Sequence, residues 1–565
     1  MSDASGHVFV VRGDLLRFAC DAIVVPTDCS GRIEQPWVEH LERLGVHVVP
    51  APVDPKGGGW LREEDRERIG GPVGPEEQLP GTWLLATATS AGGSREHVDG
   101  DAGREDVRSL EDTLEAFARR FARSQQGGEQ LGGRGCPLVA IPLLGSGEGG
   151  FRERFRHFAR ELLSILQRAA SAGGFDIALV VFGDDRADVY DALLRRERQQ
   201  LPWMMTAPAL AERWELGPSV PTSSTSVLDV IERLLGRAVD GQLVPFFGAG
   251  VSVAAGAQSW SGLLDVLDTE ARKHAATRGE TLPDVRELNE YDRAQIYHRL
   301  LGPAAFDEEI QKALSIDAPS LQHHLLAALR PRDAVTTNFD TAYELAVTRA
   351  NLGEVAVIPA SAGELRLLKL HGSLPSSPDP DGAPPASAPR LPPVFTRDQL
   401  LEHRAYGGPL RGSLQMMLLT GHVAFVGYSL SDSHLHEAIH QVRRIRAQAG
   451  GPGRSTPALA TTIQVEAAPH LSLTWAPDVD VIWPRAVGSD GAASGGIAAR
   501  ELELLLDALA DAASLAEIPV LAFDDDELDE HEVEIKRSLK ALAAALPGSG
   551  HRPAAVQSLL RAFGG

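Results

Sequence analysis

Two hydrophobic patterns alternate along the chain. Short apolar runs predict β-strands, and segments with apolar residues at helical spacing predict helices between them. Before residue 200 the predicted strands are His7–Val11, Ala22–Pro26, Trp83–Thr87, Pro137–Leu144 and Asp176–Phe182. Helical spacing relates Leu110, Leu114, Phe117 and Phe121, and then Phe155, Phe158, Leu162 and Leu166. Such alternation is typical of an α/β layered fold.

The same alternation returns in the second half of the chain. There the predicted strands are Leu243–Phe247, Ala334–Thr337, Val355–Pro359, Leu365–Leu370, Val423–Gly427, Thr461–Val465 and Val479–Trp483. These runs are almost continuously apolar, which indicates a parallel sheet covered by helices on both faces. Residues 374–393 are too rich in proline for a helix or a central strand, so we expect a surface loop there.

These patterns divide the chain into domains. With 565 residues, the chain is too long for one ordinary hydrophobic core. We expect an α/β domain at residues 1–205 and a linker without clear periodicity at 206–227. A Rossmann-like parallel-sheet domain is expected at 228–488, and a helical C-terminal extension at 489–565.

Composition narrows the classes of function. No apolar run is long enough to cross a bilayer and no signal peptide is recognisable, so we expect a cytoplasmic protein without membrane contact. The formal net charge of −23 argues against nucleic-acid binding, and the basic stretches Arg195–Arg198 and Arg443–Arg446 are interpreted as solvated helix faces. The three cysteines, Cys20, Cys29 and Cys136, include no C-x-x-C pair, which excludes a four-cysteine zinc module.

A glycine turn follows the strand Leu243–Phe247. It reads Gly248-Ala249-Gly250-Val251-Ser252, and glycine allows backbone N–H groups to approach a pyrophosphate closely. The dehydrogenase fingerprint would need a third glycine where Val253 stands, and the chain contains no P-loop motif. The turn alone therefore indicates phosphate binding only weakly.

Polar motifs also follow three further predicted strands. They are T-T-N-F-D at 336–340, K-L-H-G-S at 369–373 and G-Y-S-L-S-D at 427–432. Ligands of open α/β sheets bind at the carboxyl ends of the strands, so the sequence predicts a site at that edge.

Together with Ala255-Gly256 and Trp260, these motifs resemble the sirtuin-like superfamily in order and spacing, over about residues 228–488. The resemblance implies that Gly248, Ala249, Gly250 and Ser252 cradle the pyrophosphate of NAD. It also implies that Asn338 and Asp340 hold the nicotinamide ribose, that His371 is the catalytic histidine, and that Gly427 and Ser429 contact the nucleotide. Histidine changes its charge near neutral pH, and asparagine can orient water or ribose without bringing charge, so His371 and Asn338 suit these catalytic roles.

The resemblance also favours one reaction. Protein-deacylating sirtuins carry a four-cysteine zinc module after the His-Gly motif, where this chain has the cysteine-free loop 374–393. The chain is therefore more similar to the zinc-less sirtuin-like effectors of antiphage systems such as Thoeris, which hydrolyse NAD. We expect an NAD⁺ glycohydrolase with no metal, kept inactive at rest in a homo-oligomer. NAD-dependent deacylation, ADP-ribosyl transfer and non-catalytic binding of NAD or ADP-ribose stay open as alternatives.

The first domain has a second resemblance. Arg12-Gly13-Asp14-Leu15, the run Asp21–Asp28 and the glycine loop up to Gly150 resemble macro domains, which bind ADP-ribose in a three-layer α/β fold. By this resemblance Asp14 meets the adenine, and the diphosphate lies against Gly145, Ser146, Gly147 and Gly149. Pro26-Thr27-Asp28 replaces the asparagine-rich loop of that family. We expect a sensor of an ADP-ribose-derived signalling nucleotide.

A competing motif lies at residues 436–440, which read H-E-A-I-H. The H-E-x-x-H pattern places two histidines on one helix face, where they bind zinc beside a glutamate base. No third ligand motif follows in the sequence, so a zinc peptidase is the less favoured reading.

Overall fold

The protein is described by a computed structural model, which covers residues 6–28, 32–35, 37–50, 59–62, 81–88, 102–124, 130, 133–144, 155–182, 187–218, 225–316, 318–353, 355–358, 365–374, 391–449, 457–485, 495–514, 521 and 530–545. It divides into two compact units. Unit 1 comprises residues 1–204 and 514–565, and unit 2 comprises residues 205–513. Among the described residues, no helix combines the length and apolar character needed to cross a membrane.

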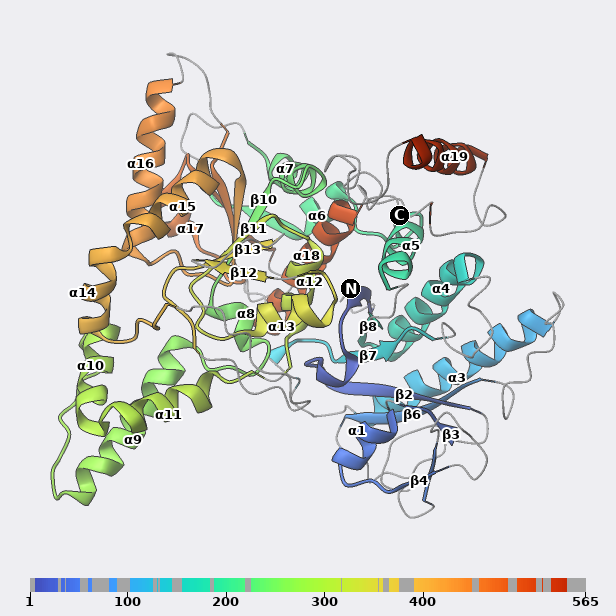
Figure 1. Cartoon of the computed structure of the whole chain (residues 1–565), viewed down its shortest axis with the longest axis horizontal. Helices are drawn as coiled ribbons and strands as arrows, with labels where there is room; N and C mark the ends of the chain where they lie inside the picture. The colour runs from blue at the N-terminus through green and yellow to red at the C-terminus, as the bar shows by residue number, and fades with distance from the viewer. Residues whose placement is uncertain are drawn as a thin grey trace. The chain divides into compact units, whose positions relative to one another are not determined.

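Unit 1 is built on a parallel sheet in the order β1-β8-β7-β2-β6 (Figure 1). The strands are β1 (Val8–Arg12), β2 (Ala22–Asp28), β6 (Thr82–Ala88), β7 (Leu138–Pro142) and β8 (Asp176–Val181). A three-stranded sheet is formed by β3 (Arg32–Ile33), β4 (Val48–Pro50) and β5 (Gly59–Leu61). The helices are η1 (Leu15–Arg17), α1 (Trp37–Arg43), α3 (Ala102–Ser124), α4 (Phe155–Gly173), α5 (Ala187–Gln199) and α19 (Glu530–Ala545).

The two faces of this sheet belong to different cores. Val24 packs in the large cluster that also contains side chains of α3, α4 and α5, whereas its neighbour Val25 packs with α1. Adjacent residues of a strand point to opposite faces, so β2 contributes to both cores. The predicted strands of this region are confirmed, and so are the two predicted helical stripes, except for Phe155, whose side chain lies outside the described residues. The macro-like character of the unit stays a prediction.

The expectation that Arg195–Arg198 forms a solvated helix face is wrong for two of its arginines. Arg195 and Arg198 are buried, and they donate hydrogen bonds to the carbonyl oxygens of Val10 and Val8. Asp191 accepts a further bond from Arg195. Because β1 is an edge strand, its outer carbonyl groups need partners, and the two arginines of α5 supply them.

Unit 2 contains an eight-stranded sheet in the order β12-β13-β11-β10-β14-β15-β16-β9. The strands are β9 (Trp214–Leu216), β10 (Leu243–Phe247), β11 (Asp333–Thr336), β12 (Val355–Ile358), β13 (Leu365–Lys369), β14 (His422–Val426), β15 (Ala460–Ile463) and β16 (Val479–Pro484). All neighbouring pairs are parallel except β16 and β9, which are antiparallel. The predicted parallel sheet is therefore confirmed.

Helices cover both faces of this sheet. On one face Phe246 packs against Phe425 with ring centroids 5.0 Å apart, in a core shared with α15 (Gly408–Thr420), α16 (Ser433–Ala449) and α17 (Pro469–Trp475). On the other face Phe247 lies 4.9 Å from Tyr343 of α13 (Ala342–Arg349), which packs on α12 (Leu321–Ala328). Unit 2 also contains α6 (Ala207–Arg213), α7 (Val227–Val239), α8 (Ala249–Val253), α14 (Arg397–Tyr406) and α18 (Gly495–Ser514).

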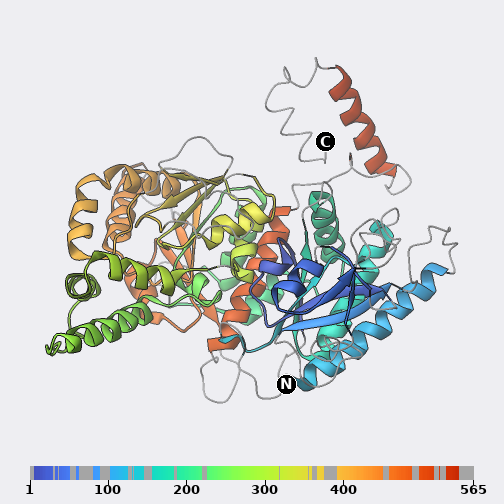
Figure 2. The ribbon, with the colours of Figure 1, turned by 60° about the horizontal axis from the view of Figure 1, so that its bottom comes forward.

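Three helices form a separate layer at one end of unit 2. They are α9 (Trp260–Thr277), α10 (Glu290–Leu301) and α11 (Pro303–Leu314), drawn in yellow-green (Figure 2). Their core includes Leu264, Tyr297 and Phe306, and Phe395 joins it from the segment before α14. The apolar side chains of this layer therefore meet the residues that flank the sheet edge described below.

Part of the segment predicted as a linker, 206–227, is structured. Residues 207–213 form α6, and residues 214–216 form β9 at the edge of the sheet. Trp214 is fully buried, and Arg213 pairs with Glu501 of α18. The expected C-terminal extension, 489–565, contributes α18 to unit 2 and α19 to unit 1. The physical reason is that α6, β9 and α18 bury apolar side chains that periodicity alone does not assign to a core.

Candidate functional site

The four polar motifs of unit 2 meet at one edge of the sheet. Each motif follows the carboxyl end of a strand, and those strands, β13, β11, β10 and β14, are consecutive neighbours in the sheet. Parallel strands end on the same edge, so the loops after them lie side by side. The structure thus brings together the segments that contain Gly248, Asn338, His371 and Gly427.

The glycines of two of these loops interlock. Gly248 N–H donates to Val426 O at 3.0 Å, and Gly250 N–H donates to Gly427 O at 3.0 Å. A Cβ on Gly250 would lie 2.8 Å from the Cα of Gly427, and Gly427 has a φ of +59°. Glycine is required here because the two turns approach each other closely. Binding of a pyrophosphate by Gly248, Ala249 and Gly250 stays a prediction, since turn packing already explains two of these glycines.

Asn338 is held in one orientation by the β10 turn. Its side-chain N–H groups donate to Gly248 O at 3.0 Å and to Ser252 Oγ at 2.8 Å, and its backbone N–H donates to Thr336 Oγ1. The Asn338 side chain is therefore buried with both of its donors used. Its Oδ1 atom is left to accept a hydrogen bond from a water molecule or a hydroxyl group of a ligand.

Asp340 lies in the same network. Its Oδ2 accepts a hydrogen bond from Ser252 Oγ at 2.8 Å, and its Oδ1 accepts one from the N–H of Ala342 at 3.0 Å. Both carboxylate oxygens therefore have partners within the protein, although each oxygen can accept more than one bond. Asp340 connects the β10 turn to the start of α13, and contact between Asp340 and a ribose stays a prediction.

His371 is paired with an aspartate that the sequence analysis did not assign. His371 Nε2 lies 2.7 Å from Asp432 Oδ2, and the two side chains are only 11% and 13% exposed. An ionised carboxylate accepts but does not donate, so Nε2 carries the proton and Nδ1 is the acceptor nitrogen of the neutral ring. The signal that could have identified Asp432 is its place at the end of G-Y-S-L-S-D, on the sheet edge that also holds His371.

The turn that carries Asp432 has an unusual backbone. Leu430 is buried with a φ of +58°, a left-handed conformation that is uncommon for a residue other than glycine. Ser429, which the sequence assigns to nucleotide contact, is exposed, and its Oγ lies 2.8 Å from Ser431 Oγ. Strained residues of this kind concentrate at functional sites because the surrounding structure holds them in place.

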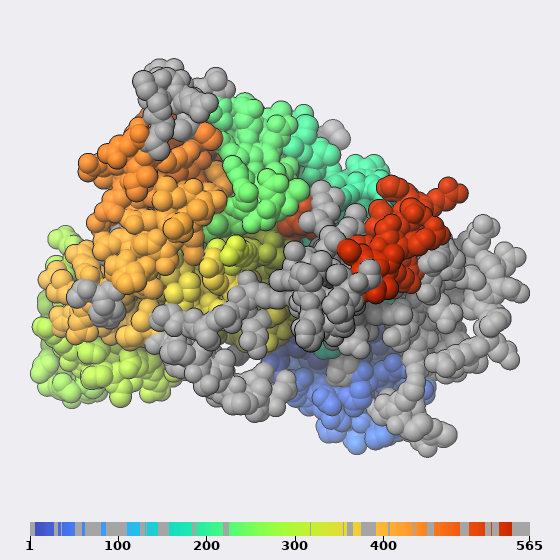
Figure 3. Space-filling model, turned by 45° about the horizontal axis from the view of Figure 1, so that its top comes forward, coloured from blue at the N-terminus to red at the C-terminus, as the bar shows by residue number. Residues whose placement is uncertain are grey.

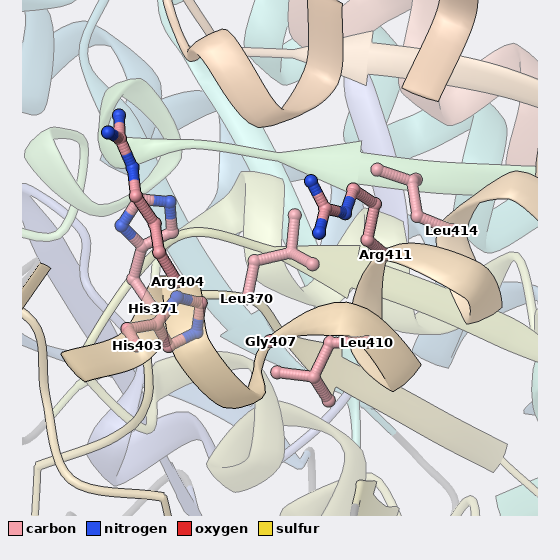
Figure 4. A pocket seen from close by; sticks show the side chains of 8 residues that line it. All are labelled: Leu370, His371, His403, Arg404, Gly407, Leu410, Arg411 and Leu414. Carbon is pink, nitrogen blue, oxygen red and sulfur yellow. The ribbon is translucent and has the colours of Figure 1, made fainter. Parts of the chain in front are cut away.

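A pocket opens beside His371. It lies between the end of β13 and the helices α14 and α15 (Figure 4). Polar and charged side chains line it together with leucines: His371, His403, Arg404, Arg411, Leu370, Leu410, Leu414 and the backbone of Gly407. The rings of His371 and His403 are stacked with centroids 6.2 Å apart. The pocket gives water access to the histidine.

An aromatic cluster fixes the loop between Asn338 and Asp340. Phe339 packs on Phe395 with ring centroids 4.2 Å apart, and Trp260 stacks on Phe395 at 6.0 Å. Trp260 belongs to α9, so this cluster connects the separate helical layer to the sheet edge.

The H-E-x-x-H residues make other contacts. His436 Nε2 donates to the carbonyl oxygen of Leu430 at 2.8 Å, and Glu437 pairs with Arg411. His440 is exposed on α16, which forms part of the surface of unit 2 (Figure 3). Within the part of the chain that the structure describes, no group of three His, Cys, Asp or Glu residues could hold a metal ion. The expectation of a metal-free site stays a prediction.

The candidate ligand site of unit 1 is described only in part. Asp14 follows β1, its Oδ1 accepts the N–H of Leu16 at 3.0 Å, and its Oδ2 lies 3.9 Å from Arg17 Nε. Asp14 thus caps η1. Gly145, Ser146, Gly147 and Gly149 lie outside the described residues. The role of both segments in binding a nucleotide stays a prediction.

Comparison with known families agrees with the geometry of unit 2. Residues 332–467 match the family described as SIR2-like domain. The matched range includes Asn338, Asp340, His371, Gly427 and Asp432, and ends before β16. Residues 332–467 of unit 2 are therefore similar to SIR2-like domains.

One relative is known by its association with defence. The chain is 25% identical over 230 residues to "Defense-associated sirtuin 2" of Bacillus subtilis. The alignment covers 39% of this chain and 21% of the relative, so the chain spans about a fifth of that protein's length. The similarity supports a relation between this chain and sirtuin-like defence proteins.

Proposed function

We propose that unit 2 hydrolyses NAD⁺ at the nicotinamide–ribose bond, with His371 and Asn338 as its catalytic residues. The observation that carries this proposal is the convergence of His371, Asn338 and the β10 turn on one edge of a parallel sheet, within a SIR2-like domain. Hydrolysis, rather than deacylation, is favoured by the cysteine-free sequence that follows the His-Gly motif.

The proposed chemistry follows from the charge of the substrate. Nicotinamide leaves NAD⁺ with the electron pair of the bond between its ring nitrogen and ribose C1′, so the leaving group needs no proton. A water oxygen then bonds to C1′ and loses a proton. Asn338 Oδ1 accepts a hydrogen bond from that water and orients it, and His371 Nδ1 takes the proton. Asp432 holds the ring and stabilises the imidazolium that forms.

The test is release of nicotinamide from NAD⁺ by the purified full-length chain, measured with and without ADP-ribose. We expect His371→Ala and Asn338→Ala to lower the rate by roughly 10²-fold or more, as loss of a general base or a positioning group does. His440→Ala, an exposed histidine of the H-E-x-x-H motif, is the matched control and should keep the wild-type rate. If the ADP-ribosyl group is transferred to protein instead of water, the activity is ADP-ribosyl transfer. If it is transferred to an acyl group, the activity is NAD-dependent deacylation.

We further propose that unit 1 is a macro-like sensor that releases the activity of unit 2 when it binds an ADP-ribose-derived nucleotide. What supports this is the parallel sheet of unit 1, in which Asp14 follows the carboxyl end of β1, and the glycine-rich sequence of residues 145–150. Calorimetry of ADP-ribose with the full chain tests it. Asp14→Ala should abolish binding, whereas Asp112→Ala, at an exposed position of α3, should not.

The biological role that we propose is defence by depletion of NAD, and the name of the Bacillus subtilis relative supports the defence part of this role. Such an enzyme has to be silent until a signal arrives, so we propose an inactive homo-oligomer at rest. Light scattering gives the oligomeric state, and constant NAD turnover by the protein without any nucleotide would contradict the resting state.

A further inference from the structure

A buried lysine contacts the loops that carry the candidate catalytic residues. Lys369 is the last residue of β13, and its side chain is only 2% exposed. The Nζ group donates to three acceptors: the carbonyl oxygen of Asp340, Glu344 Oε1 at 2.8 Å and Ser373 Oγ at 3.2 Å. All three donors of the ammonium group are therefore used.

The three acceptors lie in two loops of the site and in the helix that follows one of them. Asp340 lies in the loop after β11, two residues beyond Asn338, and Glu344 follows in the first turn of α13. Ser373 lies in the loop after β13, two residues beyond His371. The same two loops are joined by one backbone bond, from Leu374 N–H to Phe339 O at 2.9 Å. Lys369 thus cross-links the asparagine loop to the histidine loop.

A buried ammonium is an expensive way to stabilise a fold. Its desolvation costs free energy, which the ion pair with Glu344 does no more than offset. Proteins with apolar residues of similar volume at such positions are often equally stable or more stable. The hydrogen bonds of Lys369 differ from apolar packing in one respect: they fix directions and distances between the loops. This argues for a role in geometry rather than in stability.

We propose that Lys369 is a positioning residue, which sets the separation of Asn338 and His371 by holding their loops together. The inference rests on the proposed NAD cleavage for its effect on rate. Lys369 itself does not reach the pocket beside His371, because its ammonium group is enclosed by Asp340, Glu344 and Ser373.

The decisive variants separate positioning from stability. Lys369→Met leaves Glu344 as an unpaired, largely buried carboxylate, so it should lower both the melting temperature and activity. The double variant Lys369→Met with Glu344→Leu removes both charges and should regain most of the melting temperature. We expect its kcat for nicotinamide release to stay reduced by roughly 10- to 100-fold, since small displacements of reacting groups have effects of that size. KM for NAD⁺ should change much less than kcat.

Two further variants complete the kinetic test. Lys369→Arg keeps the charge but replaces three tetrahedral donors with a planar fork, so it should rescue kcat only in part. Lys312→Met, at an exposed lysine that pairs with Glu308 and Glu309 on α11, is the matched control and should behave as wild type. A double variant with wild-type kcat would overturn the proposal and make Lys369 merely the partner of Glu344.

Hydrogen exchange on the full chain tests the same idea without any enzymatic activity. In the double variant, backbone amides of residues 337–341 and 371–374 should exchange faster together, whereas those of β14 and β15 should not change. Unchanged exchange in both loops would also overturn the proposal. If the wild-type chain releases no nicotinamide under any condition, the proposed function fails, and this measurement still decides the role of Lys369.

Discussion

At the scale of the residue, the pairing of His371 with Asp432 determines which ring nitrogen is available. The 2.7 Å contact to Nε2 leaves Nδ1 as the proton acceptor. An amide at position 432 can also donate a hydrogen bond, and it would favour the tautomer with the proton on Nδ1. The charge and the acceptor character of Asp432 are therefore both needed for the proposed base.

This predicts the effect of Asp432→Asn. Nicotinamide release should fall by roughly 10²- to 10⁴-fold, because the ring would be held in the wrong tautomer and the imidazolium would lack a counter-charge. NAD binding should change little. Steady-state kinetics with Asp240→Asn as control, at an exposed aspartate that ends α7, measures this. A wild-type rate for Asp432→Asn would mean that the contact does not tune the histidine.

Two buried histidines, His323 and His422, should make the stability of the folded protein depend on pH. Burial lowers the pKa of His323 from 6.5 to about 3. Burial, with the nearby cations Arg233, Arg237 and Arg446, lowers the pKa of His422 to about 3. Both rings stay neutral in the folded protein while the unfolded chain takes up protons below pH 6.5. Their stabilising contribution is therefore present above about pH 6.5 and is lost as the pH falls toward 3.

Each histidine should reduce the free energy of unfolding by about 2 kcal/mol between pH 7 and pH 5. Urea titrations at a series of pH values measure this slope for the wild type. His422→Gln should make the curve flatter, because one of the two groups no longer titrates, whereas His440→Gln at an exposed site should keep the wild-type curve. Parallel curves for His422→Gln and the wild type would contradict the assignment.

At the scale of the element, the site depends on how closely the β10 and β14 turns approach each other. Gly427 combines a φ of +59° with a position where a Cβ would lie 2.8 Å from the backbone nitrogen of Val251. The contact is between backbone atoms, so no side chain can move away to relieve it. The glycines that the sequence assigns to ligand binding therefore also allow the turns after β10 and β14 to approach each other closely.

Gly427→Ala should destabilise the protein and disturb the site. The left-handed conformation alone costs roughly 1–2 kcal/mol for a residue with a Cβ, and the steric contact adds to that. Gly412→Ala is the matched control, because Gly412 lies inside helix α15 with open space around it. That change should leave stability unchanged or raise it by up to about 1 kcal/mol. Thermal melting of both variants gives the comparison, and equal melting temperatures would rule out the interlocked turns as a constraint.

At the scale of the whole molecule, the limits of unit 2 differ from those that periodicity suggests. Trp214 of β9 is fully buried beside β16, and Arg213 pairs with Glu501 of α18. The segment that forms α6 and β9 and the segment that forms α18 both lie outside residues 228–488. A fragment with those limits would expose the edge of β16 and lose the burial of a tryptophan.

We therefore expect a fragment of residues 205–513 to melt at a higher temperature than a fragment of residues 228–488. Loss of a buried tryptophan alone costs about 3–5 kcal/mol in typical cores. Circular dichroism melts of the two purified fragments test this, with soluble yield as a second readout. Equal melting temperatures of the two fragments would show that α6, β9 and α18 do not contribute to the stability of unit 2.

The sequence alone determined the strands and the order of the motifs. Runs such as Leu243–Phe247 and Val479–Trp483 are apolar enough to form only buried strands. The residues that form the turns after them follow directly in the sequence. The resemblance of those motifs pointed to Asn338 and His371, which the fold then places on one sheet edge.

Only the tertiary structure decided which distant side chains meet. The pairs His371–Asp432 and Lys369–Glu344 join residues from distant segments of the chain, and no periodicity links them. Short elements such as β9 were missed because three residues carry too little pattern, and pairing with β16 defines that strand. Arg198 was expected in solvent because charge alone suggests it, but the free carbonyl groups of an edge strand supply partners inside the fold. Contacts of this kind depend on strand order, which a linear pattern does not contain.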